Sequence, residues 1–219
     1  MIYVVKHKPD NFKYFDGYCE LKVGDIFDKP GTDNINNLNL QLNELTGLYW
    51  MWKNTNDEIV GLCHYRRFFV DDNKIMTWDK AQSLVKENEL VVQNWYSFGK
   101  SLKDNLKDHF PNHQDTFMKY YQIFISREPG LKDYFETERF NPQHLFVGHR
   151  DFVEQYSSWL YPLIIPIAEQ FKAEDASKCP DMLYQRMISY ICERLLTYFI
   201  QKTGQKYIEY PVVRIEGKL

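Results

Sequence analysis

Short apolar runs and longer helical stripes follow one another along the chain. Apolar runs bounded by polar residues predict strands at 2–6, 59–63, 89–93 and 145–147. Apolar residues at three- and four-residue spacing predict helices from near Asn39 to Trp52, from about Arg150 onward, and over 78–88, 113–126 and 181–202. Strands that alternate with helices indicate an α/β domain built on a largely parallel or mixed sheet.

Two segments lack a regular period. Residues 10–38 are polar and contain three glycines and a proline, which predicts a long ordered loop of the kind that often carries function. Residues 94–112 are polar and aromatic. Near the end of the chain, Gly204 is expected to end the last helix, and Pro211 favours an edge position for the final strand or two.

The apolar run 59–63 ends abruptly in four polar side chains, His64, Tyr65, Arg66 and Arg67. Ligands of open α/β sheets bind at the C-terminal ends of the strands. Two adjacent arginines at such an end suggest an anion, and phosphate is the first expectation. The alternative is a pair of surface or salt-bridging arginines.

Three further acidic motifs have two interpretations each. Asp71 and Asp72 could hold a divalent ion that bridges phosphates, or build an acidic turn. Asp33 and Asn34 could hydrogen-bond a base or ribose, or form an Asx turn. Glu193 lies on a narrow polar helix face, which is either solvated or lines a cleft.

Composition narrows the class of protein. A chain of 219 residues with 16% aromatic residues fits one packed domain. A net charge of −3 argues against general nucleic-acid affinity. Four scattered cysteines without a CxxC spacing argue against a structural zinc site, and with no signal peptide they favour a reduced, cytoplasmic protein.

The longest apolar segment, Trp159–Ala168, is the part of the chain that could contact a membrane. It is about half of a membrane span and is interrupted by Pro162 and Pro166, so a transmembrane helix is not expected, while a peripheral membrane contact stays open. The sequence also lacks GxGxxG and GxxxxGK[ST], so it has neither a dinucleotide fingerprint nor a P-loop.

Several motifs together resemble a bacterial family of capsular and exopolysaccharide synthesis proteins. They include `ELTGLYWMWKN`, `GLCHYRRFF` and the late `ERLL` followed by `PVV`, and the resemblance runs from residue 1 to about 216. Members of that family look like sugar-nucleotide-dependent glycosyltransferases, and some are associated with galactofuranosyl transfer. The resemblance implies a GT-A-like fold, a Rossmann-type mixed sheet flanked by helices in one domain, 1–219. Residues 1–93 would form the nucleotide-sugar half and 94–219 the acceptor half.

The resemblance also assigns residues. Donor-binding positions would be the following: His7, Asp33, Asn34, Tyr49, His64, Tyr65, Arg66, Arg67 and Arg194. Two departures concern the acceptor side, where members commonly show Asn-Met and Phe-Gly in place of His144-Leu145 and Ile188-Ser189. The DxD metal motif of GT-A enzymes has no clear counterpart, and Asp71-Asp72 substitutes for it by position only.

Two functions follow as hypotheses. In the first, the chain is a glycosyltransferase that uses a UDP-linked or other nucleotide sugar and a lipid-linked glycan acceptor at the inner membrane face. Arg66, Arg67 or a bound Mn²⁺ or Mg²⁺ would stabilise the leaving diphosphate, with Glu193 as base and Glu44 in reserve. In the second, the chain binds a nucleotide sugar or glycan without catalysis. Donor sugar, linkage, stereochemistry, metal need and oligomeric state are not readable from the sequence.

Overall fold

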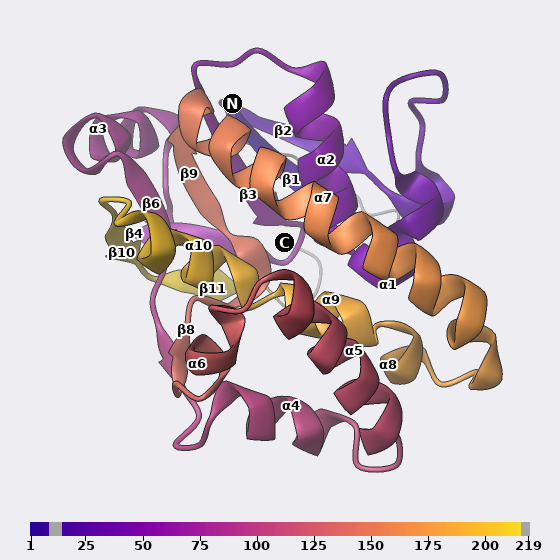
Figure 1. The fold of residues 1–219 in the computed structure, drawn as a ribbon. Coiled ribbons are helices and arrows are strands. Elements are labelled where there is room, and N and C mark those ends of the chain that lie inside the picture. Colours follow the sequence, from indigo (N-terminus) through magenta and orange to yellow (C-terminus); the bar gives the residue numbers. More distant parts are fainter. Residues whose placement is uncertain (9–14, 216–219) are drawn as a thin grey trace.

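The computed structural model describes residues 1–8 and 15–215, and its centre is one mixed sheet (Figure 1). Six strands follow one another in the order β10-β6-β9-β3-β1-β2. Their bounds are β1 Ile2–Lys6, β2 Tyr18–Lys22, β3 Ile59–His64, β6 Leu90–Gln93, β9 Phe146–His149 and β10 Ile208–Tyr210. Three more strands extend this sheet beyond β3: β4 Arg67–Asp71, β5 Lys74–Ile75 and β11 Val212–Arg214. Two short strands form a separate pair: β7 Tyr96–Ser97 and β8 Arg139–Phe140.

Strand direction brings several segments to one edge of the sheet. β1 is parallel to β2 and to β3, whereas β9 is antiparallel to both β3 and β6. The C-terminal ends of β1 and β3 therefore meet the N-terminal end of β9. This shared edge carries the polar residues described below.

Helices cover both faces of the sheet. Their bounds are α1 Asn39–Leu42, α2 Glu44–Asn54, α3 Trp78–Asn88, α4 Leu102–His109, α5 Gln114–Arg127, α6 Leu131–Phe135, α7 Arg150–Glu174, α8 Met182–Gln185, α9 Met187–Cys192 and α10 Leu195–Thr203. Alternate strand residues point to opposite faces. Tyr3 and Val5 pack with the larger core under α2 and α7, while Ile2 and Val4 pack with the smaller core under α3. The predicted fold class, a mixed sheet flanked by helices in a single domain, is confirmed.

The packing of α2 on β1 fixes the position of its first residue, Glu44. Gly47 faces Val5, and a Cβ atom at Gly47 would lie only 2.6 Å from Val5 Cγ2. The missing side chain lets the helix approach the strand closely. Asn43, which precedes the helix, has φ +48° and separates α1 from α2. The single helix predicted from near Asn39 is therefore two helices with a sharp turn between them.

The sequence patterns correctly located β1, β3, β6, β9 and α3, but three predictions were wrong. The segment predicted as a loop at 10–38 contains β2, and β4 begins at Arg67, where no strand was predicted. The helix predicted over 181–202 is divided into α8, α9 and α10. At Arg186 the backbone leaves regular helical geometry, with φ −96° and ψ 8°, and its N–H bonds Leu183 O three residues back.

Candidate functional site

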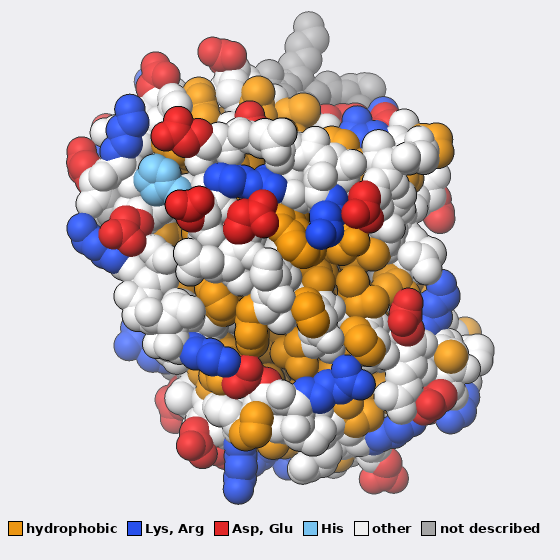
Figure 2. All heavy atoms as spheres, turned by 45° about the horizontal axis from the view of Figure 1, so that its top comes forward, with side chains coloured by type: hydrophobic (Ala, Val, Ile, Leu, Met, Phe, Trp, Pro, Cys, Tyr) orange, Lys and Arg blue, Asp and Glu red, His pale blue; other side chains and the backbone are white. Residues whose placement is uncertain are grey.

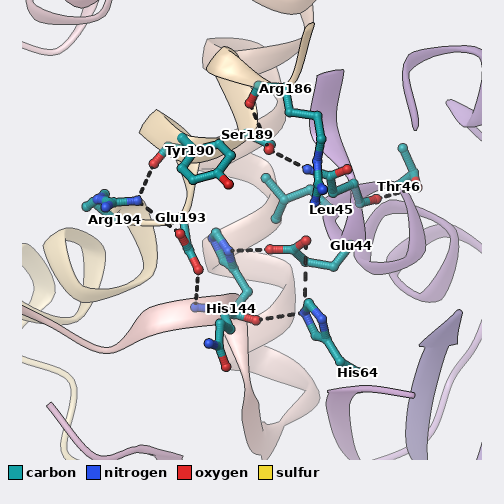
Figure 3. Close-up of polar contacts among 12 residues, drawn as sticks. Glu44, Leu45, Thr46, His64, His144, Arg186, Ser189, Tyr190, Glu193 and Arg194 are labelled. Carbon is teal, nitrogen blue, oxygen red and sulfur yellow. Dashed lines mark hydrogen bonds and ion pairs between the residues drawn. The ribbon is translucent and has the colours of Figure 1, made fainter. Parts of the chain in front are cut away.

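Four ionisable side chains, Glu44, His64, His144 and Glu193, form a cluster at the shared edge of the sheet (Figure 3). We call them the Glu–His cluster. Glu44 opens α2, His64 ends β3, His144 immediately precedes the segment leading into β9, and Glu193 follows α9. The cluster therefore takes residues from both halves of the chain. The division into a donor half and an acceptor half remains a prediction.

Glu44 lies between the two imidazoles. Its Oε1 is 3.5 Å from His144 Nδ1, and its Oε2 is 3.9 Å from His64 Nε2. Burial alone would raise the pKa of Glu44, but the neighbouring imidazoles of His144 and His64 outweigh burial and lower this pKa to about 2. Glu44 is therefore an ionised carboxylate at neutral pH. For His64, burial and the nearby Arg67 lower the pKa in spite of the two carboxylates.

A short left-handed segment connects the members of this cluster. Gln143 and His144 have φ +70° and +51°, a conformation that non-glycine residues adopt rarely. It directs the Gln143 carbonyl to His64 Nε2 at 3.1 Å and the Gln143 N–H to Glu193 Oε1 at 3.0 Å. His144 is fully buried, and its Nε2 lies 3.0 Å from the Tyr156 hydroxyl. Strained backbone that is held on several sides is typical of functional sites.

Arg194 positions Glu193. Its side chain is 2% exposed, and its Nη1 donates to Glu193 Oε2 at 2.9 Å and to Tyr190 O at 2.6 Å. Its Nη2 donates to Asn105 Oδ1 at 2.9 Å. These contacts hold Arg194 inside the protein, and its contact with the donor remains a prediction. Glu193 itself is 22% exposed and remains accessible.

Cationic side chains surround the strand ends beside the Glu–His cluster. The Arg66 guanidinium lies 4.9 Å from the Tyr65 ring centre, and the His7 ring meets the edge of Tyr65 at 5.4 Å. Burial lowers the pKa of His7, and the nearby cations, Lys8 and Arg66 among them, lower it further. The structure thus places His7 and Tyr65, from the ends of β1 and β3, in contact with each other, and their role in donor binding remains a prediction.

Arg67 sits directly opposite another arginine. It pairs in register with Arg214 of β11, and burial followed by the Arg214 charge lowers the pKa of Arg67. Like charges placed this close are unfavourable unless something neutralises them. The strand end therefore brings two arginines together, and the carboxylates of Glu193 and Glu44 also lie close enough to act on Arg67.

Three predicted donor-binding residues form a separate group. Asp33 and Tyr49 hydrogen-bond each other at 3.0 Å on the surface. Asn34 Nδ2 donates to Thr32 O at 2.7 Å, and Asn34 Oδ1 accepts from the Asn36 N–H at 3.1 Å. Asn34 thus forms the Asx turn given as its alternative role. Their contact with a ligand remains a prediction.

Asp71 and Asp72 lie in the turn between β4 and β5. Asp71 accepts from the Tyr210 hydroxyl at 3.1 Å and lies 3.8 Å from Lys80 Nζ, while Asp72 has φ +46°. Within residues 1–8 and 15–215, no group of three or more His, Cys, Asp or Glu side chains is arranged to hold a metal ion. Metal binding by Asp71 and Asp72 remains a prediction.

Sequence reasoning missed other parts of the site. Asn43 Nδ2 donates to Ser189 Oγ, and Ser189 Oγ donates to Arg186 O at 3.0 Å, which joins the start of α2 to α9. No sequence pattern marked Gln143 as part of a site, and His144 differed from the family pattern without a role being predicted for it. The break in the late helix could have been suspected from Ser189, since serine competes for backbone hydrogen bonds.

Comparison with known proteins places the chain in a family. A family model described as a domain of unknown function, DUF4422, matches residues 1–205. The chain belongs to this family. No curated protein matches it in sequence.

Among solved structures, the DUF4422 chain is similar to "WbbM bifunctional glycosytransferase apo structure", with a TM-score of 0.81 and 21% sequence identity. The match covers 99% of this chain and 45% of that one. The chain therefore spans less than half the length of its structural neighbour. A likeness at this identity shows that the two share a fold.

Proposed function

We propose that this DUF4422 chain is a glycosyltransferase. It transfers a hexosyl unit, with galactofuranose as the first expectation, from a UDP-linked donor to a growing polysaccharide or lipid-linked oligosaccharide. The supporting observation is the placement of Arg66 and Arg67 beside the Glu–His cluster at the carboxyl edge of the sheet. An anion site and carboxylates together match what transfer from a nucleoside diphosphate sugar needs.

In this proposal the arginines stabilise the negative charge that develops on the leaving diphosphate. Glu193 is proposed to accept the proton of the acceptor hydroxyl, with Glu44 as the alternative base. Both Glu193 oxygens already accept one hydrogen bond, from the Gln143 N–H and from Arg194 Nη1. A carboxylate oxygen has two lone pairs, so each retains one acceptor position. The need for Mn²⁺ or Mg²⁺ remains a prediction, and the screen described below tests it.

A second function, binding of a nucleotide sugar or glycan without catalysis, is favoured by one observation. The oxygens of both proposed bases already face other protein groups. Those of Glu44 lie near the two imidazoles, and those of Glu193 accept from the Gln143 N–H and from Arg194. Donors on a carboxylate oppose its protonation and weaken it as a base. In that case the site would bind a donor and leave it intact.

One screen separates these functions. UDP-, GDP- and dTDP-sugars are tested for binding by calorimetry and for hydrolysis or transfer, with and without Mn²⁺. The transferase proposal expects binding of a UDP-sugar together with its cleavage. Binding without cleavage under every condition supports the second function. If no nucleotide sugar binds, the transferase proposal is refuted, and the second function is refuted for nucleotide sugars.

We further propose that the enzyme works at the cytoplasmic membrane face through a peripheral contact along α7. Figure 2 shows a face of the molecule on which hydrophobic side chains gather between charged ones. On α7, Pro162 and Pro166 are exposed and Trp159 and Ile165 are half-buried. No helix in the described part of the chain is long and apolar enough to cross a bilayer. Sedimentation with anionic vesicles tests the contact, which is refuted if the protein stays in the supernatant.

A further inference from the structure

Arg186 enters the same site from the opposite side. It lies between α8 and α9, where its carbonyl accepts from Ser189 Oγ at 3.0 Å. Ser189 in turn accepts from Asn43, directly before α2. Figure 3 shows the Arg186 side chain running toward Leu45 at the start of α2. The backbone of Arg186 is thus fixed against the helix that carries Glu44.

The guanidinium of Arg186 lacks the partners that other enclosed arginines have. Its Nε is buried and has no hydrogen-bond partner among the described residues. The Nε of Arg194 is likewise buried without a partner, but Arg194 Nη1 pairs with Glu193 at 2.9 Å, and Arg150 Nη2 pairs with Glu154 at 2.8 Å. A buried donor without a partner is costly and needs an explanation.

Other cationic side chains lie near Arg186. Its charge is close enough to lower the pKa of His7, on which Lys8, Arg66 and His64 act in the same direction. Within the described chain, Arg66, Arg67 and Arg186 form no ion pair with a carboxylate. Positive groups gathered in this way repel one another, and a polyanion that binds among them relieves that repulsion.

We propose that Arg186 is a diphosphate-binding residue, which completes with His7 and Arg66 an anion site formed by both halves of the chain. Its planar guanidinium would present two parallel N–H groups to phosphate oxygens, which a lysine cannot do. The inference deepens the proposed function, because it names the group that binds the diphosphate of the nucleotide-sugar donor. It also explains why the late helix breaks at this position, since a straight helix would carry Arg186 elsewhere.

The test is calorimetry of UDP and of inorganic pyrophosphate with the wild-type chain and with Arg186→Gln. Charged hydrogen bonds of this kind correspond to a loss of about 10- to 100-fold in affinity. We expect that loss for both ligands in Arg186→Gln. Arg186→Lys keeps the charge but loses the paired geometry, so its affinity should be intermediate. Arg127→Gln, an exposed arginine in the last turn of α5, is the matched control and should bind as wild type.

The outcomes separate this inference from the proposed function. The inference is overturned if the wild type binds neither ligand, if Arg186→Gln binds both as wild type, or if Arg127→Gln is weakened equally. If Arg186→Gln does not fold, Arg186→Lys decides, and wild-type affinity in that variant also overturns the inference. If Arg186→Gln loses pyrophosphate binding while the wild type cleaves no nucleotide sugar, the anion site is supported and the transferase is refuted. If Arg186→Gln cleaves a nucleotide sugar with an unchanged KM for the donor, the transferase is supported and the anion site at Arg186 is refuted.

Discussion

Because Glu44 is ionised in the folded chain, we expect the free energy of unfolding to fall at acid pH. The pKa of Glu44 falls from the ordinary value of 4.5 to about 2 in the folded chain. Each pKa unit corresponds to about 1.4 kcal/mol, so the contribution to the free energy of unfolding is at most about 3 kcal/mol at pH 7. Because the folded pKa is the lower one, this contribution is present above pH 4.5 and is lost as the pH falls toward 2. At pH 3 roughly 1 kcal/mol should remain.

Glu44→Gln should therefore be less stable than wild type by up to about 3 kcal/mol at pH 7, and the difference should shrink at pH 3. Glutamine keeps the shape of the side chain but not the charge that faces His64 and His144. The measurement is urea unfolding of both proteins at several pH values, with a common slope as the check for two-state behaviour. Glu138→Gln, an exposed change before β8, is the control and should stay within about 0.5 kcal/mol of wild type. A difference that is the same at pH 3 and pH 7, or none at pH 7, would refute the reasoning.

Three further predictions concern the site and the sheet. Arg66→Ala and Arg67→Ala should each weaken UDP-sugar binding by about tenfold or more in calorimetry, and wild-type affinity in both would make the strand end structural. Glu193→Gln should lower kcat by about 10²-fold or more while the circular dichroism spectrum is unchanged, and near wild-type turnover would exclude Glu193 as the base. Gly61→Ala should lower stability by about 1–3 kcal/mol in thermal unfolding, because a Cβ there would lie 2.9 Å from Val147 Cγ2, and an unchanged Tm would contradict this packing.

The sequence allowed prediction of those elements whose signal is local. The helix α3 shows a complete amphipathic period after Thr77, whose hydroxyl accepts from the Lys80 N–H, and its predicted bounds match. The strands β1 and β3 are continuous apolar runs because both of their faces are buried. β2 and β4 were missed because each mixes buried residues with exposed or half-buried ones without a regular period of two, and because each depends on a distant partner, β1 or β11.

The sequence predicted the residues at the end of β3 and the acidic residues of the candidate site. It did not predict the contacts that join them to one another. His64 through Arg67 follow directly from an apolar run that ends in polar side chains. The role of His144 depends on left-handed backbone at Gln143, and the role of Arg186 depends on a helix break. The left-handed backbone at Gln143 has no local sequence signal, and the break at Arg186 has only the weak one given by Ser189. The sequence pattern could not show that Arg194 is buried against Asn105, because that contact joins residues far apart in the chain.

The central claim is that a nucleoside diphosphate sugar binds at the edge of the sheet where β1 and β3 end. Hydrogen–deuterium exchange with and without UDP locates the site directly. We predict slower exchange at 64–67, 142–144 and 186–193 when UDP is present. The competing location is a shallow depression between α4, α5 and α6 whose lining includes Lys103, Lys107 and Lys132. Protection confined to that depression, or no protection at the three predicted segments, would contradict the claim.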